Sequence, residues 1–438
     1  MRTPESHIST ETKLKRIAWL SERDPHKVFN NLMHHFNEES LKVCFNELDA
    51  RKAVGIDGID KATYKENLEE NLRELVARMK QMAYRPGPVR QVFIPKEGKS
   101  GATRPLGISN LEDKIIQKMM QKVLESIYEP IFLNCSYGFR GGIGCHNAIK
   151  DLHNHLFRYE IQTVIDVDLA NFFGTIDHTL LEDILRQKIE DEKFILYMIR
   201  MFKAGVVADG ELTISEEGVP QGSPCSPVLS NIFAHYVIDE WFENTVKGHY
   251  TGRVELFRYC DDAVICCQYE QDAKQLKRAL TRRLSEFGLE LNEEKTRLVS
   301  FSKMELRGGN KQGTFGFLGF TFYWGRSRKG RLIPKVKTNG KRLRAKLKRV
   351  NDWARTVKNQ FKLKDIWKKF CIKMEGHIRY YGISFNISKV RKFLHQGIRI
   401  LFKWLNRRSQ RKSFNWEKFR LFMENYPPPK TRVYFALF

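Results

Sequence analysis

The chain has 438 residues, of which 42% are hydrophobic and 29% charged, a composition that suits a globular protein of several domains and excludes a disordered or fibrous one. Its net charge of +25 is concentrated in residues 321–438, where 33 Lys or Arg stand against 5 Asp or Glu, and such a block predicts a nucleic-acid partner. No run of 18 apolar residues, no secretion signal and no Cys-x-x-Cys pair occurs, so we expect a reduced cytoplasmic protein without a membrane span or a structural zinc.

In chain order, the hydrophobic periodicity predicts three regions. Residues 1–80 are mostly helical, with a loop at Gly55–Gly58. The second region mixes helices and strands: a hairpin at 84–108, a helix at 111–131, a buried strand at 163–169, a helix at 178–204, a strand pair at 206–215, an amphipathic helix at 226–245, a hairpin at 254–268, a helix at 271–287, and strands at 297–301 and 315–323. From about residue 340 the pattern is helical and basic, with loops at Gly376, Gly382 and Tyr426–Lys430.

Acidic residues stand at the ends of two apolar strands. Asp261 and Asp262 occupy the tip of the second hairpin, and Asp166 and Asp168 lie two residues apart near the end of the strand at 163–169, so they share one face. Such carboxylates are costly beside apolar strands unless a cation is near. Their oxygens are the ligands that magnesium prefers, and two ions about 3.5–4 Å apart can clamp a phosphoryl transfer. An Asp-Asp pair alone is more often a turn, so the prediction depends on the motifs around it.

Those motifs occur in a fixed order along nearly the whole chain. They are Gly55–Gly58, Arg104–Ile108, Asp168–Phe173, Gly218–Pro224, Tyr259–Asp262, Leu291–Thr296, Phe317–Phe320, Tyr380–Ser384 and Trp404–Ser409. Together they resemble the reverse transcriptases encoded by bacterial group II introns, in which the residues at 259–262 form a Tyr-x-Asp-Asp box. Cys260 departs from the alanine usual in that box, and we expect the small side chain to preserve activity.

The resemblance implies an α+β right-hand polymerase, with an antiparallel palm sheet, an α-helical thumb and a basic C-terminal domain. The expected domains are an N-terminal extension at 1–80, fingers at 81–165, a palm with part of the fingers at 166–310, a thumb or maturase domain at 311–375, and a DNA-binding region at 376–438. Many relatives continue into an endonuclease domain, which we do not expect here because the sequence stops at Phe438.

The resemblance also implies the site residues. Asp168 rather than Asp166, together with Asp261, Asp262 and the backbone of Leu169, would hold two magnesium ions, with manganese as a substitute. The residues expected to bind the dNTP are Lys96 and Arg104 on the triphosphate, Phe173 under the sugar, where its ring would exclude a 2′-hydroxyl, Gln221 in the loop under the templating base pair, and Lys295 at the pyrophosphate.

The basic region contains a helix pattern over Lys341–Arg349, in which Leu343, Leu347 and Val350 share one face and the remainder is cationic. Such a helix would lie along a template–primer duplex and touch phosphates. The residues expected to contact nucleic acid are Lys341, Arg342, Arg344, Lys346, Lys348, Arg349, Arg407 and Arg408. Most of the aromatic residues among them are better explained by packing within a small helical core.

The function expected is RNA-directed DNA polymerisation, with an RNA template, a DNA or RNA primer and dNTPs, in a bacterial, nucleoid-associated protein. Binding of the structured parent intron RNA, as a maturase for splicing and retrohoming, is expected as well. Two alternatives stay open: an intron-free relative used in host antiviral defence or DNA repair, and an RNA-folding factor whose polymerase is incidental. Phe173 and the tetrad at 259–262 argue against an RNA-copying RNA polymerase.

Overall fold

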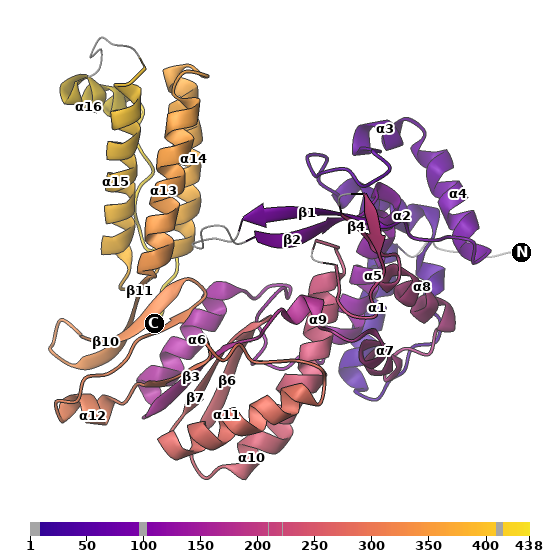
Figure 1. Cartoon of the computed structure of the whole chain (residues 1–438), viewed down its shortest axis with the longest axis horizontal. Coiled ribbons are helices and arrows are strands. Elements are labelled where there is room, and N and C mark those ends of the chain that lie inside the picture. Colours follow the sequence, from indigo (N-terminus) through magenta and orange to yellow (C-terminus); the bar gives the residue numbers. More distant parts are fainter. Residues whose placement is uncertain (1–8, 96–102, 209, 221, 409–414) are drawn as a thin grey trace, which may run out of the picture.

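The computed structural model describes residues 9–95, 103–208, 210–220, 222–408 and 415–438. The N-terminal part is a group of helices around the buried helix α5 (Leu111–Tyr128). Around it lie α1 (Thr10–Arg23), α2 (Glu38–Glu47), α3 (Lys61–Glu66) and α4 (Leu68–Lys80) (Figure 1). Asn37 and Asp60 begin α2 and α3 by accepting backbone N–H groups. The predicted loop at Gly55–Gly58 is confirmed.

Beside these helices lies a four-stranded sheet of order β2-β1-β4-β5. β1 (Val89–Pro95) and β2 (Thr103–Ile108) are antiparallel, which confirms the predicted hairpin. β4 (Val206–Ala208) pairs in parallel with β1, and β5 (Glu211–Thr213) pairs with β4. The predicted strand pair near 210 therefore exists, and it joins a hairpin about a hundred residues away in sequence, a pairing that local periodicity cannot indicate.

The central sheet has four antiparallel strands in the order β6-β7-β3-β8. They are β3 (Thr163–Asp168), β6 (Val254–Tyr259), β7 (Asp262–Cys267) and β8 (Arg297–Ser300). Because side chains alternate along a strand, Ile165 and Ile265 pack toward α11 (Glu270–Ser285), while Val164 and Val264 pack toward α6 (Cys145–Arg158). Both faces of the sheet are thus buried, and the acidic strand ends lie on the α6 side.

Two helical predictions in this region need correction. The helix predicted over 178–204 is two helices, α7 (His178–Arg186) and α8 (Glu192–Phe202), because Asp191 caps α8 and also accepts N–H groups from Leu32 and Met33. The helix over 226–245 begins as α9 (Ser226–Ala234) and continues with π-helical turns to Val246. α9 is buried on nearly all sides rather than amphipathic, because it packs between α5 and the central sheet.

The next sheet joins the central sheet to the C-terminal helices. Its order is β11-β10-β9, from β9 (Phe315–Phe317), β10 (Phe320–Arg326) and β11 (Leu332–Thr338). The single strand predicted over 315–323 is wrong, because Leu318 and Gly319 have φ of 48° and 83° and break it in two. β11 was not predicted, although the alternating burial of Pro334, Val336 and Thr338 follows a strand period. A short helix, α12 (Lys303–Arg307), precedes β9.

The C-terminal helices α13 (Gly340–Val357), α14 (Leu363–Tyr381) and α15 (Ile387–Leu405) stand side by side (Figure 1). α16 (Trp416–Asn425) closes one end, where Trp416 stacks on Phe402 with ring centroids 3.8 Å apart. The loop predicted at Gly376 is wrong, since Gly376 lies inside α14, whereas Gly382 ends that helix as expected.

The last residues return to the central part of the molecule. Phe435 pairs with Ile383 after α14 and stacks on His146 of α6 with ring centroids 5.2 Å apart, so the tail joins the helical bundle to the central sheet. Two predicted domain boundaries, 165/166 and 375/376, fall inside β3 and α14, and the division into domains remains a prediction. In the described ranges, no helix is long and apolar enough to cross a membrane.

Candidate active site

The tip of the hairpin between β6 and β7 carries two of the predicted acids. Tyr259 and Asp262 are paired across the hairpin, so Cys260 and Asp261 form the turn. Cys260 is buried, with 2% of its surface exposed, and its φ of 58° lies in the left-handed region that favours glycine. A non-glycine residue holds such a backbone only where its surroundings enforce it. The turn is therefore a constrained feature.

The third acid lies directly across the sheet. Asp168, the last residue of β3, is paired with Asp262 at the start of β7, so both side chains emerge on one face. Asp166 shares this face, but its carboxylate is paired with Arg297 at 3.1 Å. Burial, followed by the nearby charges of Asp166 and Asp261, raises the pKa of Asp262 to about 7. Desolvation by the surrounding walls and the charge of Asp168 also raise the pKa of Asp261.

A loop after α11 holds the end of β3 in place. The backbone N–H of Asn292 donates to the Asp168 carbonyl at 2.8 Å, and the Thr296 hydroxyl donates to the same oxygen at 3.3 Å. Leu169 forms a bridge with Leu291 in the same loop. This anchoring places the Lys295 ammonium 2.5 Å from Oδ1 of Asp168. A cation thus already lies on one of the three carboxylates.

These residues line an open cavity of about 1140 Å³ between the central sheet, β2 and the start of α13. The cavity brings together eight of the predicted site residues, namely Arg104, Asp168, Leu169, Phe173, Asp261, Asp262, Lys295 and Arg342. Lys96 and Gln221 lie outside the described residues, although Gly222 and Ser223, which follow Gln221, also line the cavity. A cavity of this size, with acids on one wall and basic residues on others, can hold a nucleotide together with a strand end.

A model of the family described as reverse transcriptase (RNA-dependent DNA polymerase) matches residues 94–322. The chain belongs to the reverse transcriptase family. The matched segment covers β2, the central sheet and every acid described above. The expected identification as an RNA-directed DNA polymerase is therefore confirmed.

Three curated proteins have sequences similar to this chain. The protein YkfC of Escherichia coli (strain K12) is 32% identical over 289 residues, which are 60% of this reverse transcriptase and 74% of YkfC. The group II intron-encoded protein LtrA of Lactococcus lactis subsp. cremoris is 32% identical over 223 residues, 51% of this chain and 37% of LtrA. A 91 kDa protein in the cob intron of Schizosaccharomyces pombe is 31% identical over 235 residues, 53% of this chain and 28% of that protein. The expected group II type is supported, although the chain spans well under half of the two intron proteins.

Reverse transcriptases as a family depend on divalent metal, and the carboxylates of this one suit such an ion in chemistry. All three offer oxygen ligands on one wall of the cavity, and the raised pKa values of Asp261 and Asp262 reflect burial and repulsion that a divalent cation would relieve. Within the part of the chain that the structure describes, no three acidic, His or Cys side chains are already arranged around a common point. The chemistry of these donors suits a divalent cation, although Lys295 lies on Asp168 in this structure.

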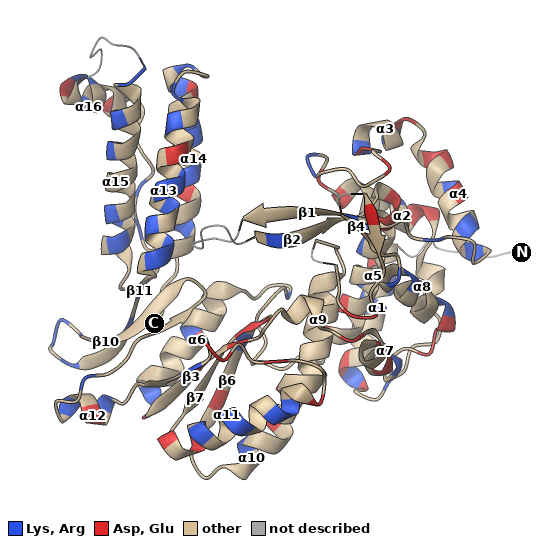
Figure 2. Cartoon of the chain, viewed as in Figure 1, with Lys and Arg blue, Asp and Glu red and all other residues tan. Residues whose placement is uncertain are grey.

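Lys and Arg residues are frequent along α13, α14 and α15, where few acidic residues lie among them (Figure 2). Lys341, Arg344 and Lys348 are exposed on α13. Arg342 lies at the start of the same helix and reaches the cavity. Other predicted contacts are partly engaged within the protein. Lys346 lies 4.9 Å above the Tyr381 ring, Arg407 stacks on Trp404, Arg408 donates to the Phe361 carbonyl, and Arg349 has further interactions.

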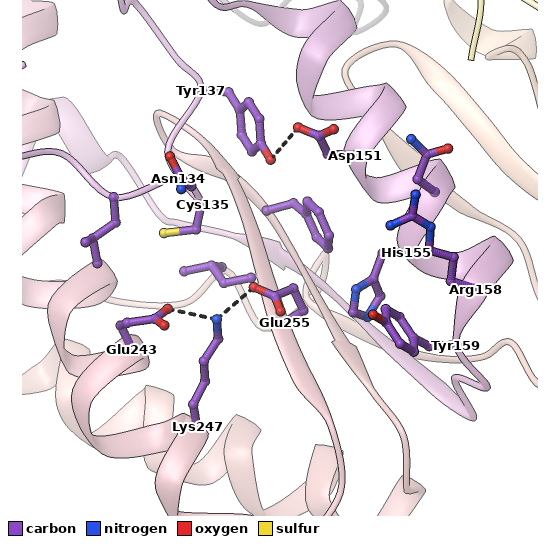
Figure 3. Close-up of a pocket in the computed structure, with 14 residues that line it drawn as sticks. Asn134, Cys135, Tyr137, Asp151, His155, Arg158, Tyr159, Glu243, Lys247 and Glu255 are labelled. Carbon is purple, nitrogen blue, oxygen red and sulfur yellow. Dashed lines mark hydrogen bonds and ion pairs between the residues drawn. The ribbon is translucent and has the colours of Figure 1, made fainter. Parts of the chain in front are cut away.

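A second cavity of about 580 Å³ lies along the β6 edge of the central sheet, and Figure 3 shows the residues that line it. In it the Tyr137 hydroxyl donates to Asp151 at 3.0 Å, and Lys247 lies between Glu243 and Glu255 at 2.8 and 2.9 Å. None of the predicted catalytic residues lines this cavity. Lys247 and its two glutamates pair with one another, and the predicted carboxylates line the larger cavity, on which the proposal below is built.

Sequence reasoning missed two residues of the reverse transcriptase site. Phe139 lines the cavity with 53% of its surface exposed and a φ of 54°, and its ring lies 6.0 Å from that of Tyr259. The glycines around it were a possible signal, since an aromatic residue in a glycine-rich loop seldom serves a core. Arg258, next to the catalytic tetrad, was also missed, because a buried arginine in a strand gives no pattern that differs from an exposed one.

Proposed function

We propose that this chain extends a primer on an RNA template by two-metal phosphoryl transfer at the cavity lined by Asp168, Asp261 and Asp262. The observation that carries the proposal is the convergence of these acids with Arg104, Phe173 and Lys295 around one opening, although the residues come from separate parts of the sequence. Metal ligands, a sugar-facing ring and cations for the phosphates are the parts that nucleotide transfer needs.

In this proposal Asp168 and Asp261 are the principal metal ligands, and Asp262 and the backbone of Leu169 assist. Bound magnesium, or manganese in its place, supplies the Lewis acid that activates the primer 3′-hydroxyl and neutralises the triphosphate. Arg104 projects from β2 into the cavity, where its guanidinium can bind phosphate oxygens in a bidentate manner. Lys96, which lies outside the described residues, would act beside it.

Phe173 and Lys295 would act at opposite ends of the nucleotide. The Phe173 ring follows the end of β3 and lines the cavity, so it would occupy the space that a ribose 2′-hydroxyl requires. The Lys295 ammonium is paired with Asp168, and with Asp168 holding a metal it would be free to neutralise the leaving pyrophosphate. Gln221 would lie under the templating base.

The fold supports a right-hand arrangement for this chemistry. β1 and β2 with the N-terminal helices would act as fingers, the central sheet as palm, and the α13–α15 bundle as thumb. The exposed basic side chains of α13 would follow the phosphates of the template–primer duplex, with a DNA or RNA primer. Arg342 would lie nearest to the primer end, since it alone of that group reaches the catalytic cavity.

The direct experiment is dNTP incorporation on poly(rA)/oligo(dT) with magnesium, comparing the natural protein with Asp261→Asn/Asp262→Asn. The proposal predicts extension by the natural protein and a loss of at least about a thousandfold in the variant, because the charge that holds the metal is gone. Equal binding of labelled template–primer by both proteins would show that the loss is chemical. Equal extension by both proteins would remove the acids from the mechanism.

We also propose a maturase role, in which the protein binds structured group II intron RNA and promotes its folding. The observation that favours it is the similarity to LtrA, described as a group II intron-encoded protein, together with the basic bundle. An in vitro splicing assay at low magnesium, on a self-splicing group II intron RNA, tests this role. The Asp261→Asn/Asp262→Asn variant should still promote splicing, and a natural protein that gives no acceleration would overturn the proposal.

A further inference from the structure

Arg258 lies in β6, directly before the catalytic tetrad, and its guanidinium is completely buried. Asp239, also 0% exposed, accepts two hydrogen bonds from it, from Nε at 2.7 Å and from a terminal nitrogen at 2.5 Å. This bidentate geometry suits a guanidinium and not an ammonium group. A buried ion pair contributes little net stability, because both charges lose their hydration. Stability alone therefore does not account for the Arg258–Asp239 pair beside the tetrad at 259–262.

The remaining N–H donors of Arg258 contact the turn at Cys260 and its surroundings. One terminal nitrogen donates to the Cys260 carbonyl at 3.1 Å and to Oδ1 of Asn231 at 3.2 Å, and the other donates to the Ser136 hydroxyl at 2.7 Å. All five guanidinium N–H groups thus have an acceptor. One of these acceptors is the peptide carbonyl that joins Cys260 to Asp261, so Arg258 sets the plane of the peptide from which the Asp261 carboxylate extends.

A second contact confines the preceding peptide, which joins Tyr259 to Cys260. A Cβ atom at Gly138 would lie 2.7 Å from the Cys260 backbone nitrogen, so only glycine allows the chain at 138 to approach this closely. Asn231 donates to the Gly138 carbonyl at 2.5 Å and accepts from Arg258, which links the turn at Gly138 to Arg258. The left-handed Cys260 is thereby held between Gly138 and the guanidinium.

We infer that Arg258, oriented by Asp239, is a positioning residue that holds the turn at Cys260 in its left-handed form and so directs Asp261 toward the metal. Arg258 does not line the catalytic cavity, so it acts through the turn and not on the substrate. This inference rests on the proposed function, since it assigns Asp261 to metal binding. It predicts that loss of Arg258 weakens metal binding more than it weakens nucleic-acid binding.

The test compares Arg258→Lys and Asp239→Asn with the natural protein. Manganese binding is measured by electron paramagnetic resonance without nucleotide, and half-saturating magnesium is measured in primer extension. We expect the Kd for manganese and the half-saturating magnesium concentration each to rise by about tenfold or more, the usual effect of disturbing a group that orients a metal ligand. The Kd for template–primer should stay unchanged. Lysine should fail to rescue, because it cannot reach Asp239, Ser136 and the carbonyl at once.

Arg140→Lys is the matched control. The Arg140 side chain is 9% exposed, pairs with Glu129 and donates to three backbone carbonyls, those of Glu129, Leu133 and Ser136, but it makes no bond to Cys260. This variant should lower the melting temperature and leave the metal requirement unchanged. Since breaking a buried pair can unfold a protein, Arg258→Met/Asp239→Leu removes both charges together and keeps the volume.

The outcomes are distinct. Folded Arg258 or Asp239 variants with the manganese affinity of the natural protein would overturn the inference, as would an equal rise in the Arg140→Lys control. An inactive natural protein would instead count against the proposed polymerase, and the manganese titration would still report on Arg258. If Arg258→Lys unfolds, manganese binding is measured on Arg258→Met/Asp239→Leu instead. Normal metal binding in that folded variant would contradict the assignment of Arg258 as a positioning residue.

Discussion

The ammonium group of Lys295 lies 2.5 Å from Oδ1 of Asp168, so a side chain occupies the position where a metal ligand must become available. Both side chains remain partly exposed, at 46% and 39%, and the pair can therefore separate without a large rearrangement. The proposed mechanism gives Lys295 two opposite effects: it competes with the first metal and later stabilises the leaving group.

The Lys295→Met variant separates these effects. Without nucleotide, we expect manganese to bind several-fold more tightly, because its competitor is gone. Single-turnover incorporation should nevertheless fall by about tenfold or more, because the charge near the pyrophosphate is lost. Titration by electron paramagnetic resonance and rapid-quench kinetics give the two values. Lys277, which pairs with Glu293 on the outer side of the same loop at 2.9 Å, provides the control variant Lys277→Met.

Phe173 should control the choice of sugar. Replacement by alanine opens the cavity beside the end of β3, so a ribonucleotide gains room for its 2′-hydroxyl. We expect the ratio of kcat/KM for dNTP over rNTP to fall by about tenfold to a hundredfold, the range that one steric contact provides. Phe194→Leu is the control, because Phe194 is buried in the same core and does not line the cavity, so its loss should affect stability alone. Unchanged selectivity in Phe173→Ala would remove the ring from this role.

The exposed basic residues of α13 should set the salt dependence of duplex binding. The Lys341→Ala/Arg344→Ala/Lys348→Ala variant should weaken binding of RNA–DNA duplexes regardless of sequence. Each lost phosphate contact lowers the slope of log K against log salt by about 0.7–0.9, so the slope should fall by about 2. Fluorescence anisotropy between low and moderate salt measures it.

A matched control removes positive charge on the opposite side of the central sheet. Lys274 and Arg282 lie on α11, which packs on the face of the sheet that does not carry the acids. Lys274→Ala/Arg282→Ala should leave the slope close to that of the natural protein. A comparable fall in both variants would indicate that net charge, and not a docked α13, governs binding.

His377 should make the protein sensitive to acid. Its ring is 4% exposed and stacks on Phe393 at 3.6 Å, and neither ring nitrogen has a hydrogen-bond partner among the described residues. Burial lowers its pKa to about 3. Between about pH 6.5 and 3, His377 therefore binds a proton in the unfolded chain but not in the folded chain. The free energy of unfolding falls as the pH decreases through this window.

The His377→Phe variant removes both the unpaired nitrogens and this linkage. It should melt at a higher temperature than the natural protein, with a larger gain at pH 5 than at pH 7.5. Other buried histidines with lowered pKa values, such as His35 and His235, will keep part of the acid sensitivity. Differential scanning fluorimetry at the two pH values measures the gain, and an equal gain at both would show that His377 does not titrate on unfolding.

Much of the site was predictable because its residues lie in short motifs with a local signature. The acids at strand ends and the hairpin at 254–268 follow from alternation and turn residues, whereas Arg104 and the choice of Asp168 over Asp166 came from the family resemblance, and the cavity brings Arg104 and the three aspartates together. The break at Leu318 and Gly319 was not predictable in this way. The local pattern there predicts one strand, whereas the break is packed against distant residues of α14: the Tyr380 hydroxyl donates to the Leu318 carbonyl at 2.8 Å, and a Cβ atom at Gly319 would lie 2.8 Å from the Tyr381 hydroxyl.

The missed residues depend on tertiary contacts. Arg258 is oriented by hydrogen bonds to Asp239 and Ser136, which are 19 and 122 residues away in sequence. α9 appeared amphipathic because polar residues such as Ser230 and Asn231 break its apolar run, yet both are buried in the structure. A polar residue on a helix is therefore no guide to solvent when a distant partner or a packed layer covers it.

The proposed mechanism depends most directly on which aspartate of β3 takes part in catalysis. The decisive measurement is the single-turnover rate of dTTP incorporation on poly(rA)/oligo(dT) with saturating magnesium, for Asp168→Asn and Asp166→Asn in parallel. We predict that Asp168→Asn abolishes incorporation, whereas Asp166→Asn, whose natural carboxylate is paired with Arg297, keeps a rate within about tenfold of the natural protein. Full activity in Asp168→Asn would contradict the assignment of the catalytic centre.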